Sequence, residues 1–242
     1  MSHHGREYIP IHPQLLWTAV ARHWMSLLAL FCGVLAPLLI FGALAEDVWS
    51  REGFAWDAPI LRFVHGYDTP ARDALMVAIT TAGAACGMVP LCLLTLGVLL
   101  WRRRQRDALF AALAYGGALA FAGLGKAVFH SARPHLWVSP VPETSYGFPS
   151  GHAMGSMALL AALILVAWPT RWRWPALALG VLAVALIGLS RLYLGVHYPS
   201  DVLGAWTASL AWVVGLRLIL IAPAPRWRVN YIRHAQNRGG HG

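Results

Sequence analysis

Long uncharged apolar stretches alternate with short polar connections along most of the chain. The stretch from His23 to Ala45 contains no Asp, Glu, Lys or Arg. At about 1.5 Å per helical residue it is long enough to cross a hydrocarbon layer of about 30 Å. Five later stretches are also long and apolar, although the one over residues 108–129 contains Lys126 and the one over residues 201–221 contains Asp201 and Arg217. The pattern therefore predicts six membrane-spanning helices, over residues 23–45, 74–101, 108–129, 152–168, 174–190 and 201–221.

Two of the polar connections are long. Residues 46–73 are acidic with interspersed aromatic side chains, which predicts an amphipathic segment lying at the membrane interface. Residues 130–149 contain four prolines in irregular positions, which predicts a loop. Ala43-Leu44-Ala45 imitates a signal-peptidase site, but the preceding apolar stretch is longer than a typical signal-peptide core, so we expect the first helix to be retained.

The composition agrees with a membrane protein. Of the 242 residues, 58% are hydrophobic and 12% are charged, whereas soluble domains carry about 25% charged residues. We expect an all-α, polytopic membrane fold with one domain over residues 1–242. The three cysteines lie within apolar stretches, and we expect buried thiols rather than a disulfide framework or a metal site.

The distribution of basic residues predicts the topology. The net charge is +9, and the arginines cluster between apolar stretches, as at residues 102–106, which favours membrane anchoring over nucleic-acid binding. With six helices, the basic connections and both termini fall on one side, which the positive-inside rule assigns to the cytoplasm. Residues 46–73, 130–149 and 191–200 then share the opposite side.

Three segments that interrupt the apolar pattern lie on that opposite side. Lys126, the only lysine in the chain, precedes Arg133 in the first segment, and Arg191 lies in the third. Arginine matches phosphate oxygens with a forked set of donors, and three cations could hold a phosphate monoester of about two negative charges. Taken alone, each of these side chains could equally be an ordinary anchor at the membrane interface.

The second and third segments add groups suited to phosphoryl transfer. Ser150 and Gly151 precede an apolar stretch and predict a capped helix start whose free N–H groups favour an anion. His197 and Asp201 lie four residues apart, so the carboxylate could fix the imidazole tautomer and leave a lone pair on the other nitrogen. His197 would then be the nucleophile, and His152 would protonate the leaving oxygen. An ordinary capped helix and a structural His–Asp pair are the alternatives.

The residues of these segments disfavour a metal centre. Only Glu143 and Asp201 supply carboxylates among the three segments, and the surrounding cations would repel a metal ion. We expect neither a metal nor a cofactor.

The three segments resemble the signature motifs of the type 2 phosphatidic acid phosphatase (PAP2) superfamily, which read K-x6-R-P, P-S-G-H and S-R-x5-H-x3-D. The resemblance covers residues 126–201. It implies a phosphohistidine at His197, a general acid at His152 and an orienting carboxylate at Asp201, with no metal required. Every residue that the three motifs specify is present in this sequence. The resemblance assigns phosphate binding to Lys126, Arg133, Ser150, Gly151 and Arg191.

The resemblance also implies a class of substrate. Six-span members are typically bacterial inner-membrane enzymes that face the periplasm and act on lipid phosphates. We expect undecaprenyl pyrophosphate first and phosphatidylglycerol phosphate next, with the bilayer as the other partner and no nucleic acid. A lipid phosphotransferase using the same phosphohistidine stays open. A transporter is less favoured because the chain shows no repeated halves, and the oligomeric state is left open.

Overall fold

Helices make up all the regular structure in the computed structural model, which describes residue 24 and residues 27–221. This confirms the predicted all-α class. In chain order the elements are a π-helical turn η1 (Phe31–Leu35), α2 (Ala36–Ser50), α3 (Asp57–His65), α4 (Pro70–Gly83), α5 (Ala85–Trp101), α6 (Gln105–Phe129), α7 (Gly151–Ala167), α8 (Arg173–Tyr193) and α9 (Pro199–Ile221).

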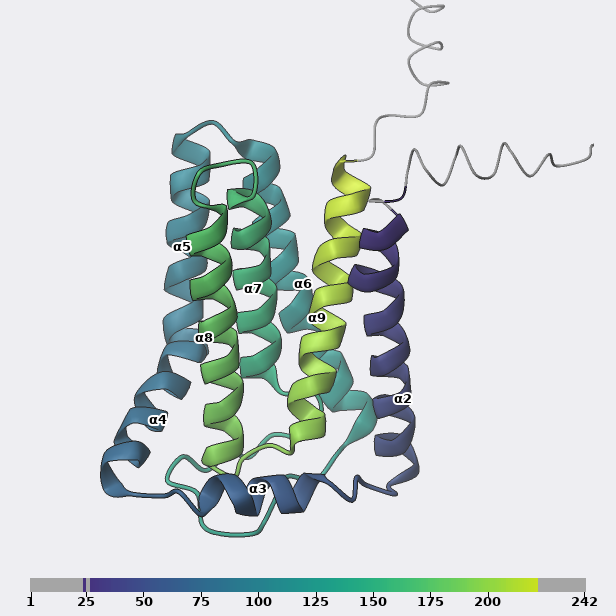
Figure 1. The fold of residues 1–242 in the computed structure, drawn as a ribbon, viewed down its shortest axis with the longest axis vertical. Helices are drawn as coiled ribbons and strands as arrows, with labels where there is room; N and C mark the ends of the chain where they lie inside the picture. The colour runs from purple at the N-terminus through teal and green to yellow at the C-terminus, as the bar shows by residue number, and fades with distance from the viewer. Residues whose placement is uncertain (1–23, 25–26, 222–242) are drawn as a thin grey trace, which may run out of the picture.

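The long helices form a bundle with α7 at its centre (Figure 1). Helix α7 packs against α6, α8 and α9, and α2 packs against α9 on the outside. Small side chains on the facing sides of α6 and α7, such as Ala114 and Ala158, are fully buried. Small residues let apolar helices approach closely, which is how helices pack in a bilayer.

The expected number of six membrane spans is not confirmed. Among the described residues, four helical stretches are long and apolar enough to cross a membrane, and α4 with α5 makes a fifth if the pair counts as one span bent by 44°. Helix α7 is apolar but has only 17 residues. The four stretches are Leu27–Ser50, Gln105–Phe129, Arg173–Tyr193 and Pro199–Leu220.

The predicted second span, 74–101, is a bent pair of helices rather than one straight helix. Ala84 between them has an extended backbone, with φ −75° and ψ 175°, so it cannot continue the helical turn. Gly87 allows the tight bend, because a Cβ atom there would lie 2.1 Å from the carbonyl oxygen of Ala82. A hydropathy pattern does not contain this break, since both halves are apolar.

Two further expectations need correction. The first helix continues past Ala45 to Ser50 and α4 begins at Pro70, so the amphipathic segment expected over residues 46–73 is shorter than predicted and contains α3. Figure 1 shows α3 lying across one end of the bundle, as an interfacial helix would. The cysteines are not all buried: Cys92 is buried, whereas Cys32 and Cys86 are exposed, because an apolar helix in a bilayer also has a face that packs against no other helix.

Helix α3 is tied to the start of α9 by one buried carboxylate. Asp57 accepts a hydrogen bond from the backbone N–H of Ser200 (3.0 Å) and another from its hydroxyl (2.6 Å). Both side chains are buried. The carboxylate thus satisfies a free N–H group in the first turn of α9 and interacts favourably with the positive end of the helix. Asp201, the next residue, is positioned by the same turn.

We expect Asp57→Ala to lower the thermal stability of the protein in detergent. The substitution leaves two buried donors of Ser200 unsatisfied, which costs about 1–3 kcal/mol, or several degrees in Tm for a chain of this size. Asp68→Ala, which removes an exposed carboxylate 4.0 Å from His65, is the control and is expected to leave Tm nearly unchanged. Equal melting temperatures for the two variants would contradict the tether.

Candidate active site

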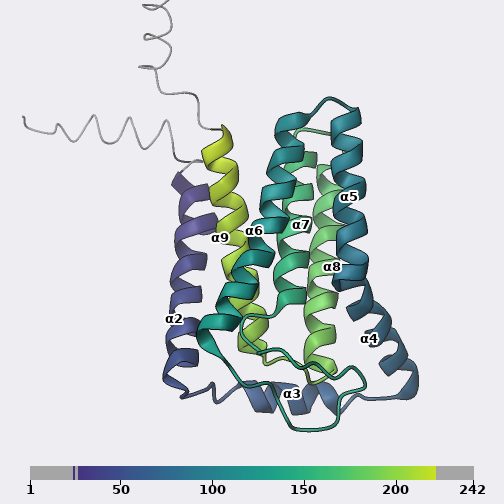
Figure 2. The same ribbon diagram turned by 180° about the vertical axis from the view of Figure 1, so that it is seen from behind.

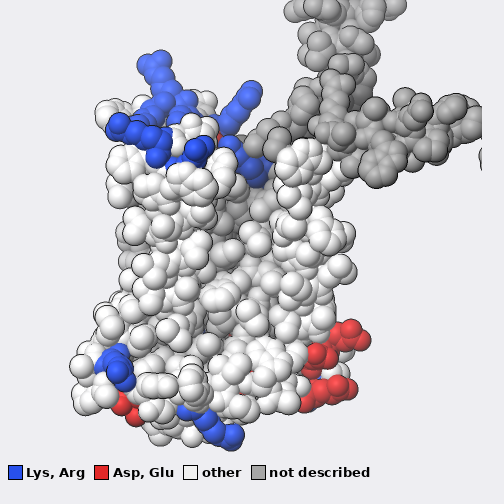
Figure 3. Space-filling model, in the orientation of Figure 1, with Lys and Arg blue, Asp and Glu red and all other residues white. Residues whose placement is uncertain are grey.

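The three segments singled out from the sequence meet at the end of the bundle where α3 lies. Figure 2 shows the connection between α6 and α7 crossing this end. Figure 3 shows arginine side chains gathered at the opposite end, where the α5–α6 and α7–α8 turns lie. The structure brings all eight predicted site residues together: Lys126, Arg133, Ser150, Gly151, His152, Arg191, His197 and Asp201.

His197 is fully buried and has both ring nitrogens in contact with charged groups. Its Nδ1 lies 3.2 Å from Oδ2 of Asp201, and that oxygen also accepts the backbone N–H of Tyr198 (2.9 Å). A carboxylate partner assigns the proton to Nδ1, so Nε2 carries the lone pair. Nε2 lies 3.0 Å from Nη1 of Arg133, which donates to it. Gly195, with φ +67°, forms the turn after α8 that presents this histidine.

Arg133 is the hub of the site. Its Nη1 also donates to the carbonyl oxygen of Val196 (2.6 Å). Its Nε donates to the carbonyl oxygen of Ser145 (2.5 Å), and its Nη2 donates to Oε2 of Glu143 (2.8 Å). The side chain is only 8% exposed, so its charge is held at a fixed position beside the imidazole of His197.

Arg191, in the last turn of α8, is 1% exposed. Its Nη1 donates to Oγ1 of Thr80 (2.5 Å), and its Nη2 contacts Oε1 of Glu143. Its Nε is buried and has no hydrogen-bond partner among the described residues. Thr80 lies on α4, so the first helix of the bent pair fixes the orientation of this guanidinium. Sequence reasoning missed Thr80, because a threonine inside an apolar stretch carries no distinguishing signal.

The start of α7 presents polar groups to the same point. Ser150 occupies the N-cap position but makes no capping hydrogen bond with its side chain, contrary to the expectation from the sequence. Its Oγ is buried and finds no hydrogen-bond partner within residues 27–221. Space is open beside Gly151, since a Cβ atom there would meet nothing within 4 Å. The first N–H groups of the helix have no intrahelical acceptor and favour an anion.

Two residues of the loop, Glu143 and Ser145, link the cations. Besides its contacts with both arginines, the Glu143 carboxylate lies 3.9 Å from Nδ1 of His152. The Ser145 hydroxyl accepts from Lys126 Nζ (2.8 Å) and from Arg133 Nη2 (3.0 Å). Sequence reasoning did not assign either residue to the site. The available signal was that Glu143 is the one acidic residue in the proline-rich loop between two motifs.

The charges of the site determine the ionisation of His197 and Glu143. Burial, together with the charges of Arg191 and Arg133, lowers the pKa of His197 well below its ordinary 6.5, so the imidazole is neutral near pH 7. Burial alone would raise the pKa of the Glu143 carboxyl, but the two guanidinium groups outweigh burial and lower it. Glu143 is therefore an anion among three cations.

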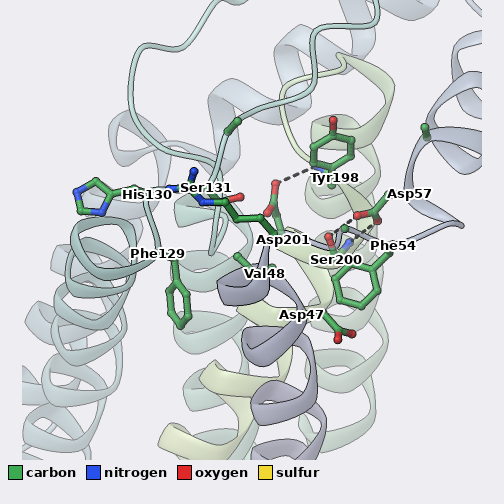
Figure 4. A pocket seen from close by; sticks show the side chains of 14 residues that line it. Asp47, Val48, Phe54, Asp57, Phe129, His130, Ser131, Tyr198, Ser200 and Asp201 are labelled. Carbon is green, nitrogen blue, oxygen red and sulfur yellow. Dashed lines mark hydrogen bonds between the residues drawn. The ribbon is translucent and has the colours of Figure 1, made fainter.

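A polar cavity of about 420 Å³ reaches Asp201 from the side of α2 and α3 (Figure 4). Asp47, Asp57, His130, Ser131 and Tyr198 are among its lining residues. Because Asp201 lies on the Nδ1 side of His197 and Arg133 lies on the Nε2 side, this cavity is separate from the cation cluster. The described residues contain no group of three or more His, Cys, Asp and Glu side chains suited to a metal ion.

A neutral imidazole facing a buried cluster of cations defines a site for phosphoryl chemistry, and comparison with known proteins gives the family. The model of the PAP2 superfamily matches residues 107–224. The undecaprenyl-diphosphatase of Sulfolobus acidocaldarius is 24% identical over 79% of this chain and 91% of its own. The phosphatidylglycerophosphatase B of Bacillus subtilis is 31% identical over 71% of this chain and 87% of its own. The chain belongs to the PAP2 superfamily.

The fold has a counterpart of known structure. The transmembrane PAP2-type phosphatidylglycerolphosphate phosphatase from Bacillus subtilis superimposes with a TM-score of 0.70 at 24% identity, over 76% of this chain and 94% of that chain. This likeness shows a shared fold. The comparisons confirm the predicted family, the predicted enzyme class of phosphatase, and an integral membrane protein.

We expect Thr80→Val to weaken substrate binding more than turnover. The substitution keeps the volume but removes the acceptor of Arg191 Nη1, so a buried guanidinium loses a fixed orientation at a cost of about 1–3 kcal/mol. KM should rise on the order of tenfold. Thr81→Val is the matched control, because the exposed Thr81 hydroxyl bonds only to its own helix. Steady-state kinetics of both variants test this, and unchanged KM in Thr80→Val would refute the positioning role.

Proposed function

We propose that this protein hydrolyses a lipid phosphate or pyrophosphate through a phosphohistidine on His197, without a metal. One observation carries the proposal. His197 is buried with Nδ1 held by Asp201, so that Nε2 faces Arg133 and, beyond it, the other cations of the site. An imidazole fixed in this way is a nucleophile with its lone pair aimed at the position where three cations would hold a phosphoryl group.

In the first step, the Nε2 lone pair attacks phosphorus and the bond between phosphorus and the leaving oxygen breaks. The electron pair leaves with that oxygen, and protonated His152 supplies its proton. Lys126, Arg133 and Arg191, with the N–H groups at the start of α7, stabilise the charge on the phosphoryl oxygens. Asp201 stabilises the positive charge that develops on the imidazole.

In the second step, His152 takes a proton from water as the water oxygen attacks phosphorus. The P–N bond breaks, its electron pair returns to Nε2, and inorganic phosphate is released. With a pyrophosphate substrate the first leaving group is the lipid monophosphate, and with a monoester it is the lipid alcohol. The same residues serve both cases, so the cations select the phosphoryl group rather than the lipid.

An apolar groove beside the site supports a lipid substrate. A cavity of about 450 Å³ lies between α2, α6 and α9, and Pro149 next to Ser150 forms part of its wall. Gly125 and Phe129 flank Lys126 on α6 and line the same groove. An acyl or prenyl chain in this groove would bring its phosphate to the cation cluster. The remaining walls include Leu38, Phe41, Leu124 and Trp212.

The relatives indicate which lipids to test first. Their names give undecaprenyl diphosphate and phosphatidylglycerophosphate as substrates of those proteins. We propose undecaprenyl pyrophosphate as the first candidate here and phosphatidylglycerol phosphate as the second.

We also propose a bacterial inner-membrane location with six crossings, both termini in the cytoplasm and the active site at the periplasmic face. The arginine-rich turns at residues 102–106 and 171–173 lie at the end of the bundle away from the site, as the positive-inside rule requires for that orientation. Helix α7 has only 17 residues, but it is surrounded by α6, α8 and α9. A helix enclosed in this way need not match the bilayer thickness as closely as a lipid-facing helix, so α7 can serve as one of the six crossings. The basic residues of both termini lie outside the described residues.

We expect phosphate release by the purified protein to persist in excess EDTA and to fall at least about a thousandfold in His197→Ala. The assay follows inorganic phosphate from undecaprenyl pyrophosphate, phosphatidylglycerol phosphate and phosphatidic acid in detergent. His65→Ala, which removes a half-exposed imidazole on α3, is the control and should retain activity. Loss of activity in EDTA, or full activity in His197→Ala, would refute the mechanism. Consumption of the substrate only when an acceptor lipid is present, with its phosphate recovered on that lipid and not as inorganic phosphate, would indicate a phosphotransferase.

We expect the acid limb of kcat/KM that reports the nucleophile to lie below pH 6.5. Burial and the charges of Arg191 and Arg133 lower the pKa of His197, so its lone pair persists as pH falls through the ordinary histidine range. The pH–rate profile between pH 5 and 8, corrected for the second ionisation of the substrate phosphate near pH ~6, measures this. Lys126→Gln removes one neighbouring charge and should move the limb to higher pH. A limb at or above 6.5 in the unaltered enzyme would contradict the prediction.

A further inference from the structure

The centre of the cation cluster is occupied by a side chain of the protein itself. The Glu143 carboxylate divides its two oxygens between two guanidinium groups: Oε2 accepts from Arg133 Nη2 (2.8 Å) and Oε1 contacts Arg191 Nη2. Oε1 also lies 3.9 Å from Nδ1 of His152. Carboxylate and phosphate oxygens accept hydrogen bonds from the same arginine donors, so Glu143 occupies the position that the proposed mechanism assigns to a phosphoryl group.

Neighbouring groups of the loop complete this occupation. The Ser145 hydroxyl accepts from Lys126 and Arg133, and the carbonyl oxygens of Ser145 and Tyr146 accept from Arg133. Residues 143–146, the cap segment, therefore contact all three cations that the proposed mechanism assigns to phosphate. A phosphate dianion and an ionised Glu143 cannot share this position, because like charges a few ångströms apart repel strongly. Substrate binding therefore requires the carboxylate to leave.

Glu143 is an incomplete substitute for phosphate. A carboxylate has two oxygens, and while it is in place Arg191 Nε and Ser150 Oγ are buried with no hydrogen-bond partner in the part of the chain that the structure describes. A phosphoryl group has additional oxygens and a larger charge, so it can satisfy both atoms, which favours the exchange. The carboxylate also has somewhere to go. Its side chain is 24% exposed, and it lines a cavity of about 610 Å³ beneath the loop.

We propose that Glu143 is an internal competitor of phosphate: it occupies the phosphate position between turnovers, is displaced by the substrate, and returns as inorganic phosphate leaves. The inference rests on the proposed function, since it presumes that the cluster binds phosphate. Such a competitor keeps Arg133 and Arg191 in position while the site is empty. It also weakens the binding of every phosphate species, product included, because the apparent Kd equals the intrinsic Kd divided by the fraction of time that the site is unblocked.

The test compares the full-length protein with Glu143→Gln in detergent, with binding of inorganic phosphate measured by titration calorimetry. If the unblocked state makes up at most about 10% of the resting protein, removal of the competing charge lowers the Kd for phosphate at least about tenfold. KM and the inhibition constant of product phosphate should fall with it. Phosphate should also raise the Tm of Glu143→Gln more than that of the unaltered protein.

Two variants keep the test decisive. Glu52→Gln removes an exposed carboxylate from the α2–α3 connection and controls for net charge; its phosphate Kd should not change. Glu143→Asp keeps the charge but shortens the side chain, so it cannot reach both arginines equally well and should also bind phosphate more tightly. It replaces Glu143→Gln if that variant does not fold.

The outcomes separate this inference from the proposed function. Phosphate binding by Glu143→Gln or Glu143→Asp that is equal to or weaker than in the unaltered protein would overturn the competitor role and leave the phosphatase proposal standing. Absence of phosphate binding and of phosphate release in every protein would overturn both.

Discussion

The constraint on which the site depends is the confinement of positive charge at the end of an apolar bundle. Arg133 and Arg191 are almost completely buried, and Lys126 lies beside them. Charges removed from water are costly unless a partner compensates them. The loop between α6 and α7 supplies Glu143 and backbone carbonyls, so the cluster is held in one arrangement before any substrate arrives. An arrangement fixed in advance does not have to be assembled at the expense of binding energy.

The same confinement sets the ionisation state of His197, the proposed nucleophile. A histidine surrounded by cations is disfavoured in its protonated form, and His197 is also buried. In the proposed mechanism Asp201 has two tasks: it selects the tautomer, and its carboxylate contacts the ring where positive charge would develop. Asp57 supports it from a distance by holding the first turn of α9. The chemistry of one imidazole therefore depends on an interfacial helix that carries none of the recognised motifs.

Much of this arrangement could be predicted from the sequence. Motif spacing identified the eight residues that the structure brings together, because residue types and order encode which groups must meet. The apolar pattern predicted an all-helical membrane protein, but not the bend at Ala84, which depends on local backbone geometry inside a uniformly apolar stretch. Thr80 and Glu143 were missed for a related reason. Their importance arises from three-dimensional contacts with Arg191, at separations of 111 and 48 residues, and no local pattern records them.

The acceptors around Arg133 have a consequence for how this enzyme can vary among its relatives. Three of them are main-chain carbonyl oxygens, those of Ser145, Tyr146 and Val196. A backbone carbonyl survives any change of its own side chain, so drift at these positions leaves the hydrogen bonds intact. The arginine has no such freedom, since no other side chain offers its set of donors. Sequence diversity can therefore accumulate around this arginine, in the loop proposed to meet the lipid headgroup, while the arginine itself stays fixed.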